Sequence, residues 1–296
     1  MFKTAQGKAY GCALATVLLW STVASAFKLA LRHLSPAELL LWSTVVATLT
    51  LAAIVTVTGG WHEIRQSSAS DWRFSVLTGF LNPFLYYLVL FKVYELLPAQ
   101  QAQPINYTWA LMLALLSVPL LGRRVTAGDL IGMLLGYTGV VIIATGGSFS
   151  ALNFTSVPGV ALALLSTVIW SLYWICGVRD QRPPVMALFQ SFLCGLVFTL
   201  VFFPLFADWR IPDWSGLLGA CYVGLFEMSV PFVLWLFALK YAERVSQISG
   251  LIFLSPPLSL VLIHCAVGEA IQRSTLVGVA LILAGLLAQK RLNHDG

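Results

Sequence analysis

One acidic side chain lies in the middle of a long apolar stretch. Glu227 follows Asp213 by 14 positions and precedes Lys240 by 13, with no other charged residue between them. A carboxylate at the centre of a bilayer is costly and by default indicates function. Two functional roles are open, a proton carrier or the partner of a substrate ammonium group. A protonated Glu227 that is hydrogen-bonded between helices is the structural alternative.

Aromatic and amide side chains recur deep inside the other apolar stretches. Indole N–H, phenol and amide groups need hydrogen-bond partners away from lipid, so we expect them to face a protein-lined cavity. Aromatic faces also attract planar solutes and cations. The candidate substrate-binding residues are Trp20, Asn82, Tyr86, Asn106, Tyr107, Trp109, Trp170 and Trp174. The serine, threonine and glycine residues nearby are expected to pack helices together instead.

The sequence carries no signal of catalysis or metal binding. It contains no HExxH, Walker A or GxSxG motif, and its five cysteines form no CxxC pair. We therefore predict that the protein is not an enzyme and that it holds no cofactor and no metal.

The composition indicates a membrane protein. Of 296 residues, 59% are hydrophobic and 10% are charged, whereas soluble domains carry about 25% charged residues. A spanning helix needs about 20 mostly apolar residues, so the length allows about ten spans and no sizeable soluble domain. The net charge of +5 is scattered along the chain, so we expect no nucleic-acid partner.

The positions of the charged residues predict an all-α fold of ten transmembrane helices. The expected spans are 9–32, 36–58, 73–95, 98–121, 127–146, 157–178, 184–206, 215–240, 244–265 and 273–291. With this topology, 12 Lys and Arg residues lie on the side of the N-terminus and 5 on the other side. The more basic side is the cytoplasmic one, so both termini are expected in the cytoplasm.

The two halves of the chain resemble each other. Short matches recur in the same order at offsets of 142 to 150 residues: Trp20-Ser21 with Trp170-Ser171, Asp71-Trp72 with Asp213-Trp214, Asn82-Pro83-Phe84 with Val230-Pro231-Phe232, Phe91-Lys92 with Leu239-Lys240, and Gly132 and Gly139 with Gly278 and Gly285. They predict two repeats, 1–147 and 155–292. Because each repeat has five spans, an odd number, the second must enter the membrane from the opposite side. Inverted repeats are typical of secondary transporters, whose substrate site lies near the midplane.

This pattern resembles the drug/metabolite transporter superfamily, specifically its ten-span EamA-type branch and within it the YddG-type aromatic amino acid exporters. The residues that carry the likeness are Trp20-Ser21, Trp170-Ser171, Asn106-Tyr107-Thr108-Trp109, Leu254-Ser255-Pro256 and Gly268-Glu269. The chain departs from the family pattern at Ala110, where a proline is frequent, and at Gly122-Arg123, where Gly-Glu is frequent. The resemblance implies a multi-pass transporter of the bacterial inner membrane.

We therefore predict a secondary transporter that exports amino acids, aromatic ones foremost, by alternating access. Tyr86, Asn106, Tyr107 and the tryptophans would bind the substrate, and Glu227 would serve as the coupling or ammonium site. The alternatives are an exporter of other small metabolites or of hydrophobic cationic drugs and, less favoured, a channel, for which no filter sequence is present. Membrane lipid is the expected surrounding, and the protein is expected to function as a monomer.

Overall fold

A computed structural model describes residues 4–122, 124–148, 155–243, 248 and 251–292, and within them the chain is helical apart from turns and loops. The helices of the first half are α1 (Ala5–Ala30), α2 (Pro36–Thr58), α3 (Trp61–Arg65), α4 (Ala69–Gly79), the π-helical turn η1 (Phe80–Leu85), α5 (Tyr86–Leu96), α6 (Ala99–Tyr107), α7 (Trp109–Leu121) and α8 (Ala127–Ala144). Those of the second half are α9 (Val157–Arg179), α10 (Pro184–Phe202), η2 (Phe203–Leu205), α11 (Trp214–Phe226), α12 (Val230–Tyr241), η3 (Leu251–Leu254), α14 (Ser255–Leu262), η4 (Ile263–Val267) and α15 (Arg273–Leu292).

Nine helical segments of the described chain are long and apolar enough to cross a membrane. They correspond to the predicted spans one to eight and ten. The predicted ninth span, 244–265, lies partly outside the described residues, and its described part belongs to a shorter apolar helix, Leu251–Val267. The fold is thus an all-helical membrane protein, and the tenth span stays a prediction.

Local signals in the sequence set where helices begin and end. The Ser35 side chain accepts a hydrogen bond from the Glu38 backbone N–H, and the Glu38 carboxylate accepts one from the Ser35 N–H. This reciprocal pair satisfies two backbone donors at the start of α2. The helix ends at Gly59, whose φ of 73° is a left-handed conformation that favours glycine.

Two long membrane segments are broken near their middle. Between α4 and α5 the backbone leaves the helical region at Asn82, with φ −146° and ψ 119°, directly before Pro83. Between α11 and α12 it leaves the regular helix at Glu227 and Ser229, which have φ of −118° and −127°. Both breaks lie where the sequence predicts proline-interrupted spans at matching positions of the two halves.

Glycines bring α8 and α15 into backbone contact. A Cβ on Gly139 would lie 2.5 Å from the Gly278 carbonyl oxygen, and one on Gly285 would lie 2.7 Å from the Gly132 carbonyl oxygen. Because the residue numbers rise along one helix as they fall along the other, the two helices are antiparallel. The predicted close packing by these glycines is confirmed.

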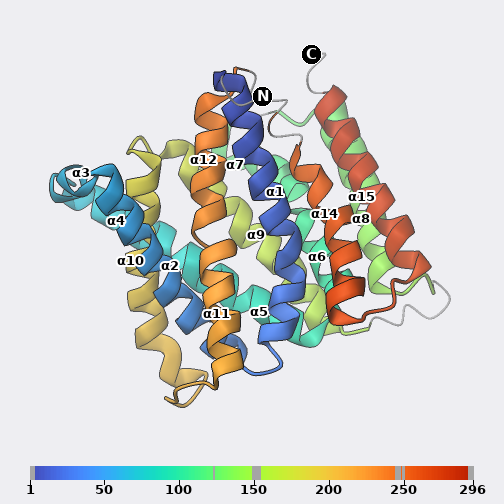
Figure 1. Ribbon diagram of the computed structural model, residues 1–296. Coiled ribbons are helices and arrows are strands. Elements are labelled where there is room, and N and C mark those ends of the chain that lie inside the picture. Colours follow the sequence, from blue (N-terminus) through green and yellow to red (C-terminus); the bar gives the residue numbers. More distant parts are fainter. Residues whose placement is uncertain (1–3, 123, 149–154, 244–247, 249–250, 293–296) are drawn as a thin grey trace.

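The helix contacts between the halves are reciprocal (Figure 1). Helix α1 packs against α12 and α14, while α9 packs against α5 and α7; α2 packs against α11, while α10 packs against α4. If each helix is replaced by its counterpart in the other half, the contact of α1 with α12 becomes that of α9 with α5. In the same way, the contact of α2 with α11 becomes that of α10 with α4. This pattern supports the inverted repeat, which stays a prediction.

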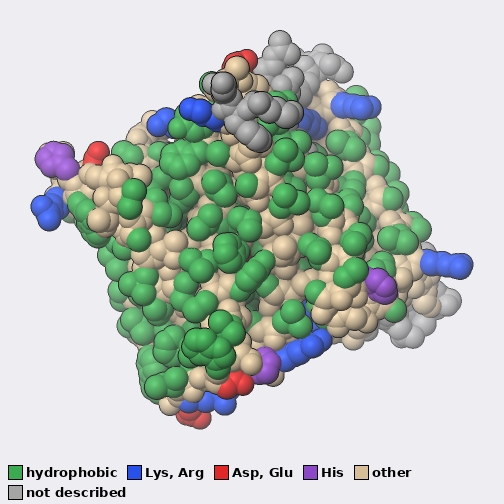
Figure 2. All heavy atoms as spheres, viewed as in Figure 1, with side chains coloured by type: hydrophobic (Ala, Val, Ile, Leu, Met, Phe, Trp, Pro, Cys, Tyr) green, Lys and Arg blue, Asp and Glu red, His purple; other side chains and the backbone are tan. Residues whose placement is uncertain are grey.

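The molecular surface has an apolar belt between two charged rims. On the face drawn in Figure 2, hydrophobic side chains cover the middle, and most charged side chains gather toward the upper and lower edges. Helix α1 begins and α15 ends on the upper side (Figure 1). This arrangement suits a protein that spans a bilayer, with both chain ends toward the same side.

Candidate functional site

A central cavity of about 380 Å³ lies between the two halves. It is bounded by α1, α5, α6, α7, α9, α12, η3 and the α11–α12 break. Aromatic side chains form most of its wall: Trp20, Phe27, Tyr86, Tyr94, Tyr107, Trp109, Trp170, Trp174, Phe232, Trp235 and Phe253. A cavity with apolar walls and a few polar groups is the usual form of a small-molecule site.

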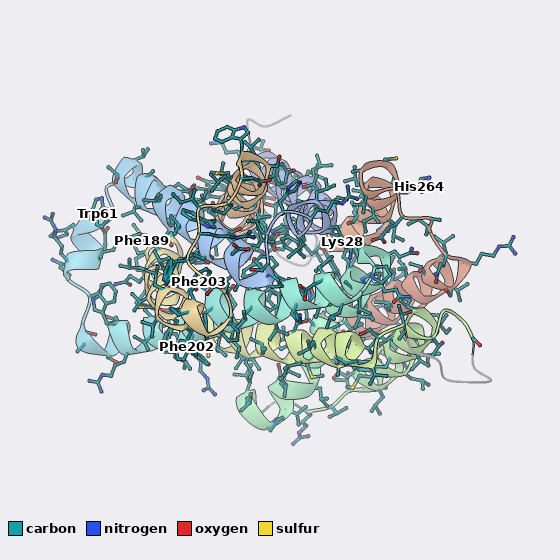
Figure 3. All side chains as sticks on the ribbon, turned by 90° about the horizontal axis from the view of Figure 1, so that it is seen from below. Lys28, Trp61, Phe189, Phe202, Phe203 and His264 are labelled. Carbon is teal, nitrogen blue, oxygen red and sulfur yellow. The ribbon has the colours of Figure 1, made fainter. Side chains whose placement is uncertain are left out.

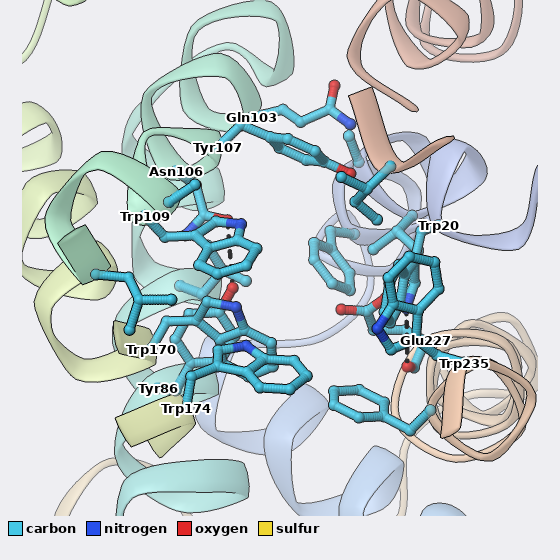
Figure 4. A pocket seen from close by; sticks show the side chains of 18 of the residues that line it. Trp20, Tyr86, Gln103, Asn106, Tyr107, Trp109, Trp170, Trp174, Glu227 and Trp235 are labelled. Carbon is cyan, nitrogen blue, oxygen red and sulfur yellow. Dashed lines mark hydrogen bonds between the residues drawn. The ribbon is translucent and has the colours of Figure 1, made fainter. Parts of the chain in front are cut away.

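Most of the predicted site residues line this cavity (Figure 4). They are Trp20, Tyr86, Asn106, Tyr107, Trp109, Trp170, Trp174 and Glu227. Asn82 does not line it and is fully buried in the α4–α5 break. Its non-helical backbone shifts its side chain away from the face that helical spacing would share with Tyr86. Its polar neighbour is the Tyr173 hydroxyl, without a hydrogen bond of normal geometry.

Stacked rings form one wall of the cavity. Tyr86 stacks on Trp170 with 4.3 Å between ring centroids, and Trp109 lies parallel to Trp174 at 6.1 Å. Trp170 also meets Trp174 edge-on at 6.0 Å. The wall therefore offers broad aromatic faces together with ring edges.

The amide of Asn106 holds this wall in place. Its Oδ1 accepts a hydrogen bond from the Tyr86 hydroxyl at 3.2 Å, and its Nδ2 donates to Ser166 Oγ at 2.9 Å. Both functional ends of the amide thus have protein partners, so Asn106 positions Tyr86 and α9.

The repeated Trp-Ser pairs have matching surroundings. Trp20 and Trp170 both line the cavity. Ser21 Oγ donates to Ser255 Oγ on α14 at 3.3 Å, and Ser171 Oγ donates to the Trp109 carbonyl on α7 at 3.0 Å. Ser21 thus bonds α14, which packs against α1, and Ser171 bonds α7, which packs against α9. In both halves the tryptophan lines the cavity.

Glu227 stands on the wall opposite the stacked rings (Figure 4). Its carboxylate accepts a hydrogen bond from the Tyr87 hydroxyl at 3.0 Å, and its backbone carbonyl accepts one from Trp20 Nε1 at 3.4 Å. Trp20 in turn packs against Phe232 and Trp235 at 5.6 and 5.9 Å. The break between α11 and α12 thus presents one carboxylate, framed by aromatic rings, to the cavity.

Several lining residues are absent from the predicted set, above all Trp235, Phe232 and Tyr94. Trp235 stands eight positions after Glu227, two helical turns along, and that spacing could have placed it on the same face. Gln103 also lines the cavity. It is 4% exposed, and its Oε1 has no hydrogen-bond partner in the described part of the chain.

One end of the cavity is closed by buried rings and hydrogen bonds. Phe27 and Tyr94 are 1% and 3% exposed. Beside them Lys28 Nζ donates to the carbonyls of Tyr94 and Leu97, at 2.7 and 2.9 Å. Figure 3 views the molecule from this side and shows Lys28 well inside its outline, with His264 at the edge. Lys28 thus ties α1 to the end of α5.

A second set of bonds closes the same end. The Glu269 carboxylate accepts hydrogen bonds from the backbone N–H groups of Ala99 and Gln100, at 2.9 and 3.1 Å, at the start of α6. The Gln100 side chain donates to the Ala270 carbonyl and accepts from the Gln272 N–H, at 2.8 and 2.9 Å. We call the bonds of Lys28, Glu269 and Gln100 the lower latch.

The opposite end of the cavity is less enclosed. Its lining residues Leu113, Leu239 and Phe253 are only half-buried. Among the described residues, no hydrogen bond joins α7 or α9 to α12 or η3 at this end. Within the described residues, the cavity is therefore tied shut at the end away from the start of α1 and less tied at the other end.

Comparisons with known proteins agree with a transporter. A model of the EamA-like transporter family matches residues 7–145 and 157–288. The chain is 27% identical over 280 residues to the aromatic amino acid exporter YddG of Ancylobacter novellus, covering 91% of this chain and 92% of that protein. It is 25% identical over 292 residues to a probable terminal-alkyne amino-acid exporter of Streptantibioticus cattleyicolor, covering 96% and 94%.

A solved crystal structure shares the fold. It superposes with a TM-score of 0.70 at 23% sequence identity, covering 97% of this chain and 98% of the other. At this identity the likeness concerns the fold alone.

Proposed function

Because this chain belongs to the EamA-like transporter family, we propose that it exports amino acids, aromatic ones foremost, across a bacterial inner membrane by alternating access. The observation that carries the proposal is the central cavity, in which one carboxylate faces a wall of stacked rings. An amino acid with an aromatic side chain has the two complementary groups, an ammonium and a planar ring.

In this proposal the substrate bridges the two walls. Its ammonium group pairs with the Glu227 oxygen that Tyr87 does not occupy, and its ring lies against Trp170 and Trp109. Charge-assisted hydrogen bonds are stronger than neutral ones, and a cation close to aromatic faces gains further attraction. Trp20 would support the break that carries Glu227, and Asn106 would orient Tyr86.

The names of the relatives support an amino acid as the solute. One is called an aromatic amino acid exporter and another a probable terminal-alkyne amino-acid exporter. The α-amino acid group is common to the solutes in both names, while the side chains differ. We therefore assign the shared group to Glu227 and the choice of side chain to the aromatic wall.

Alternating access would open the end that is now closed. In this step the lower latch would release α6 from Glu269 and α5 from Lys28, while the end near Leu113 and Leu239 would close. The antiparallel contact of α8 and α15 lies outside the cavity lining and would stay closed. With both termini in the cytoplasm, the structure would correspond to a form that is open inward.

The test is uptake of labelled phenylalanine and tryptophan by proteoliposomes that contain the purified protein. We expect saturable uptake of both and weaker uptake of small neutral amino acids. Absence of saturable uptake of any amino acid contradicts the substrate assignment. Imposing a pH gradient separates the two roles of Glu227: a rate that follows the gradient in the wild type but not in Glu227→Gln indicates proton coupling, and insensitivity of the wild type indicates an ammonium site alone.

Export of hydrophobic cationic drugs is the second candidate. The observation that favours it is the same pairing of a carboxylate with aromatic faces, which suits an organic cation. Labelled tetraphenylphosphonium in the same proteoliposomes distinguishes the two. Saturable uptake of this cation without uptake of phenylalanine would favour the drug exporter.

A further inference from the structure

A second cavity of about 240 Å³ adjoins the central one. It lies among the end of α9, the start of α10, α12 and Thr78 of α4. Three of its lining residues, Trp174, Phe232 and Trp235, also line the central cavity. These three side chains are therefore a common wall with a space on each side.

The second cavity opens toward the side of the chain ends. Gly177, Asp180 and Pro184, which line it, stand where α9 ends and α10 begins. Helix α10 begins on the upper side of Figure 1, the side on which α1 begins. A solute that comes from this side can meet the second cavity before the common wall.

The lining of the second cavity suits the aromatic ring of a solute. Tyr173, Trp174, Phe232 and Trp235 line it with rings. The hydroxyls of Thr78 and Ser191 are buried, hydrogen-bond each other at 2.7 Å and also bond the carbonyls of Phe74 and Ala187. An aromatic side chain can therefore lie in this cavity without losing a hydrogen bond, because it has no polar group that must be paired.

Arg182 does not make this cavity an anion site. Its guanidinium donates to both carboxylate oxygens of Asp180, at 2.8 and 2.6 Å. It also donates to the Asp71 carbonyl at 2.9 Å and to Gln190 Oε1 at 3.0 Å. These bonds use its donors to tie the α9–α10 connection to α4, so the rings of the lining are left to contact an occupant.

We propose that the second cavity is an entry site, in which the aromatic side chain of the transported amino acid lies before Trp174 and Trp235 part to admit it to the central cavity. The inference rests on the proposed function and adds a route to it. The Trp174 indole is half-buried, and its Nε1 has no hydrogen-bond partner among the described residues. No hydrogen bond of the indole therefore has to break when the ring turns. Ring contacts with Trp109 and Trp170 hold it in place.

Gly177 allows the route to be blocked without disturbing the fold. A Cβ added there meets no heavy atom within 4 Å, so Gly177→Cys is expected to fold, and its uptake before labelling is the reference for its uptake after labelling. Its thiol would lie in the second cavity, where benzyl methanethiosulfonate adds a ring through a reducible disulfide. We expect uptake of labelled phenylalanine to fall to the level of protein-free liposomes after labelling and to recover when dithiothreitol removes the ring.

Two controls accompany this variant. Val57→Cys places the same thiol next to the end of α2, at a residue that is 88% exposed, and its labelling is expected to leave uptake unchanged. The wild type, treated in parallel, shows whether labelling of the five native cysteines affects uptake. Saturating phenylalanine is expected to slow the labelling of Gly177→Cys but not that of Val57→Cys.

The outcomes separate this inference from the proposed function. Complete labelling of Gly177→Cys, verified by mass spectrometry, with unchanged uptake overturns the entry route. Labelling that phenylalanine does not slow overturns the occupancy of the second cavity. If the untreated wild type takes up no amino acid, the proposed function itself is wrong.

Discussion

The break at Asn82 and the break at Glu227 stand at matching places in the two predicted halves, but they face different surroundings. Asn82 and Pro83 are buried against α10, where the Pro83 ring lies so close to Gly195 that a Cβ there would be 2.4 Å from Pro83 Cδ. Glu227 instead lines the central cavity, and its carboxylate accepts a hydrogen bond from the buried Tyr87 hydroxyl.

In the predicted repeat, the difference gives the two halves different parts of one candidate site. Both breaks interrupt a membrane helix, but only one places an ionisable group in the cavity. Tyr87, which binds that group, stands five positions after Asn82 on the other broken helix. The second break thus supplies an acidic group, and the helix that follows the first break supplies the hydroxyl that orients it. This unequal pair suits a solute whose two ends differ.

The largest expected effect comes from the chemistry of the second break. Glu227→Gln keeps the shape of the side chain and removes its charge, so the substrate ammonium loses its ionic partner. Because truncating one side of a buried charge pair costs about 2–5 kcal/mol, we expect kcat/KM for phenylalanine uptake to fall about 100-fold. Glu95→Gln, at an exposed ion pair with Lys92, is the matched control. Uptake within twofold of the wild type would remove Glu227 from the site.

The next effect concerns the packing of the first break. In Gly195→Ala the new Cβ would overlap the Pro83 ring, and overpacking of this kind costs about 1–3 kcal/mol. Gly177→Ala adds the same methyl group where nothing lies within 4 Å. We expect thermal unfolding in detergent to occur at a lower temperature for Gly195→Ala only. Equal unfolding temperatures for the two variants would show that the first break tolerates movement.

Tyr87→Phe tests the contact between the two broken helices. It removes the hydroxyl that donates to Glu227 at 3.0 Å. A hydrogen bond to a charged group contributes about 1.5–3 kcal/mol, so KM is expected to rise about tenfold or more. The control is Tyr137→Phe, because the Tyr137 hydroxyl has no hydrogen-bond partner among the described residues. If both variants have the same KM, Tyr87 does not orient the carboxylate.

The smallest effect is expected at Asn82, which the sequence placed among the substrate-binding residues. Asn82→Leu removes an amide outside the cavity lining, and we expect uptake to stay within about twofold of the wild type. Asn106→Leu, a matched substitution, breaks the bonds to Tyr86 and Ser166 and is expected to slow uptake more strongly. A larger loss at Asn82 than at Asn106 would reverse the comparison of the two breaks.

The sequence predicts the spans well because charge and hydropathy alone fix where a helix can leave the bilayer. The nine long described helices agree with the predicted spans to within a few residues at most ends. Pro83 and Pro231 indicate that the third and eighth spans are interrupted. A proline does not determine the residue at which the helix begins again, so the geometry of the two breaks is not predicted.

The composition of the site is predictable, but its geometry is not. Polar and aromatic residues in apolar stretches identify most of the lining, because such groups avoid lipid. The exception at Asn82 follows from a non-helical backbone, which helical spacing does not anticipate. Phe232 escapes prediction because an apolar run of Phe, Val and Leu has the same composition whether it faces lipid or a cavity, whereas the spacing of Trp235 to Glu227 could have identified it.

In the proposed alternating-access cycle, the lower latch would affect the kinetics of transport as well as the geometry of the protein. In a carrier whose empty form is tied at one end, a solute from the untied side finds its site already formed. A solute from the tied side binds only the fraction of molecules with a released latch, so its apparent dissociation constant is raised by the inverse of that fraction. Each 1.4 kcal/mol by which the latch is stabilised raises the apparent dissociation constant on the tied side, relative to the untied side, about tenfold. This difference between the two sides is a kinetic bias. The bias sets how fast solute moves in each direction, while the driving gradient alone sets how far it accumulates.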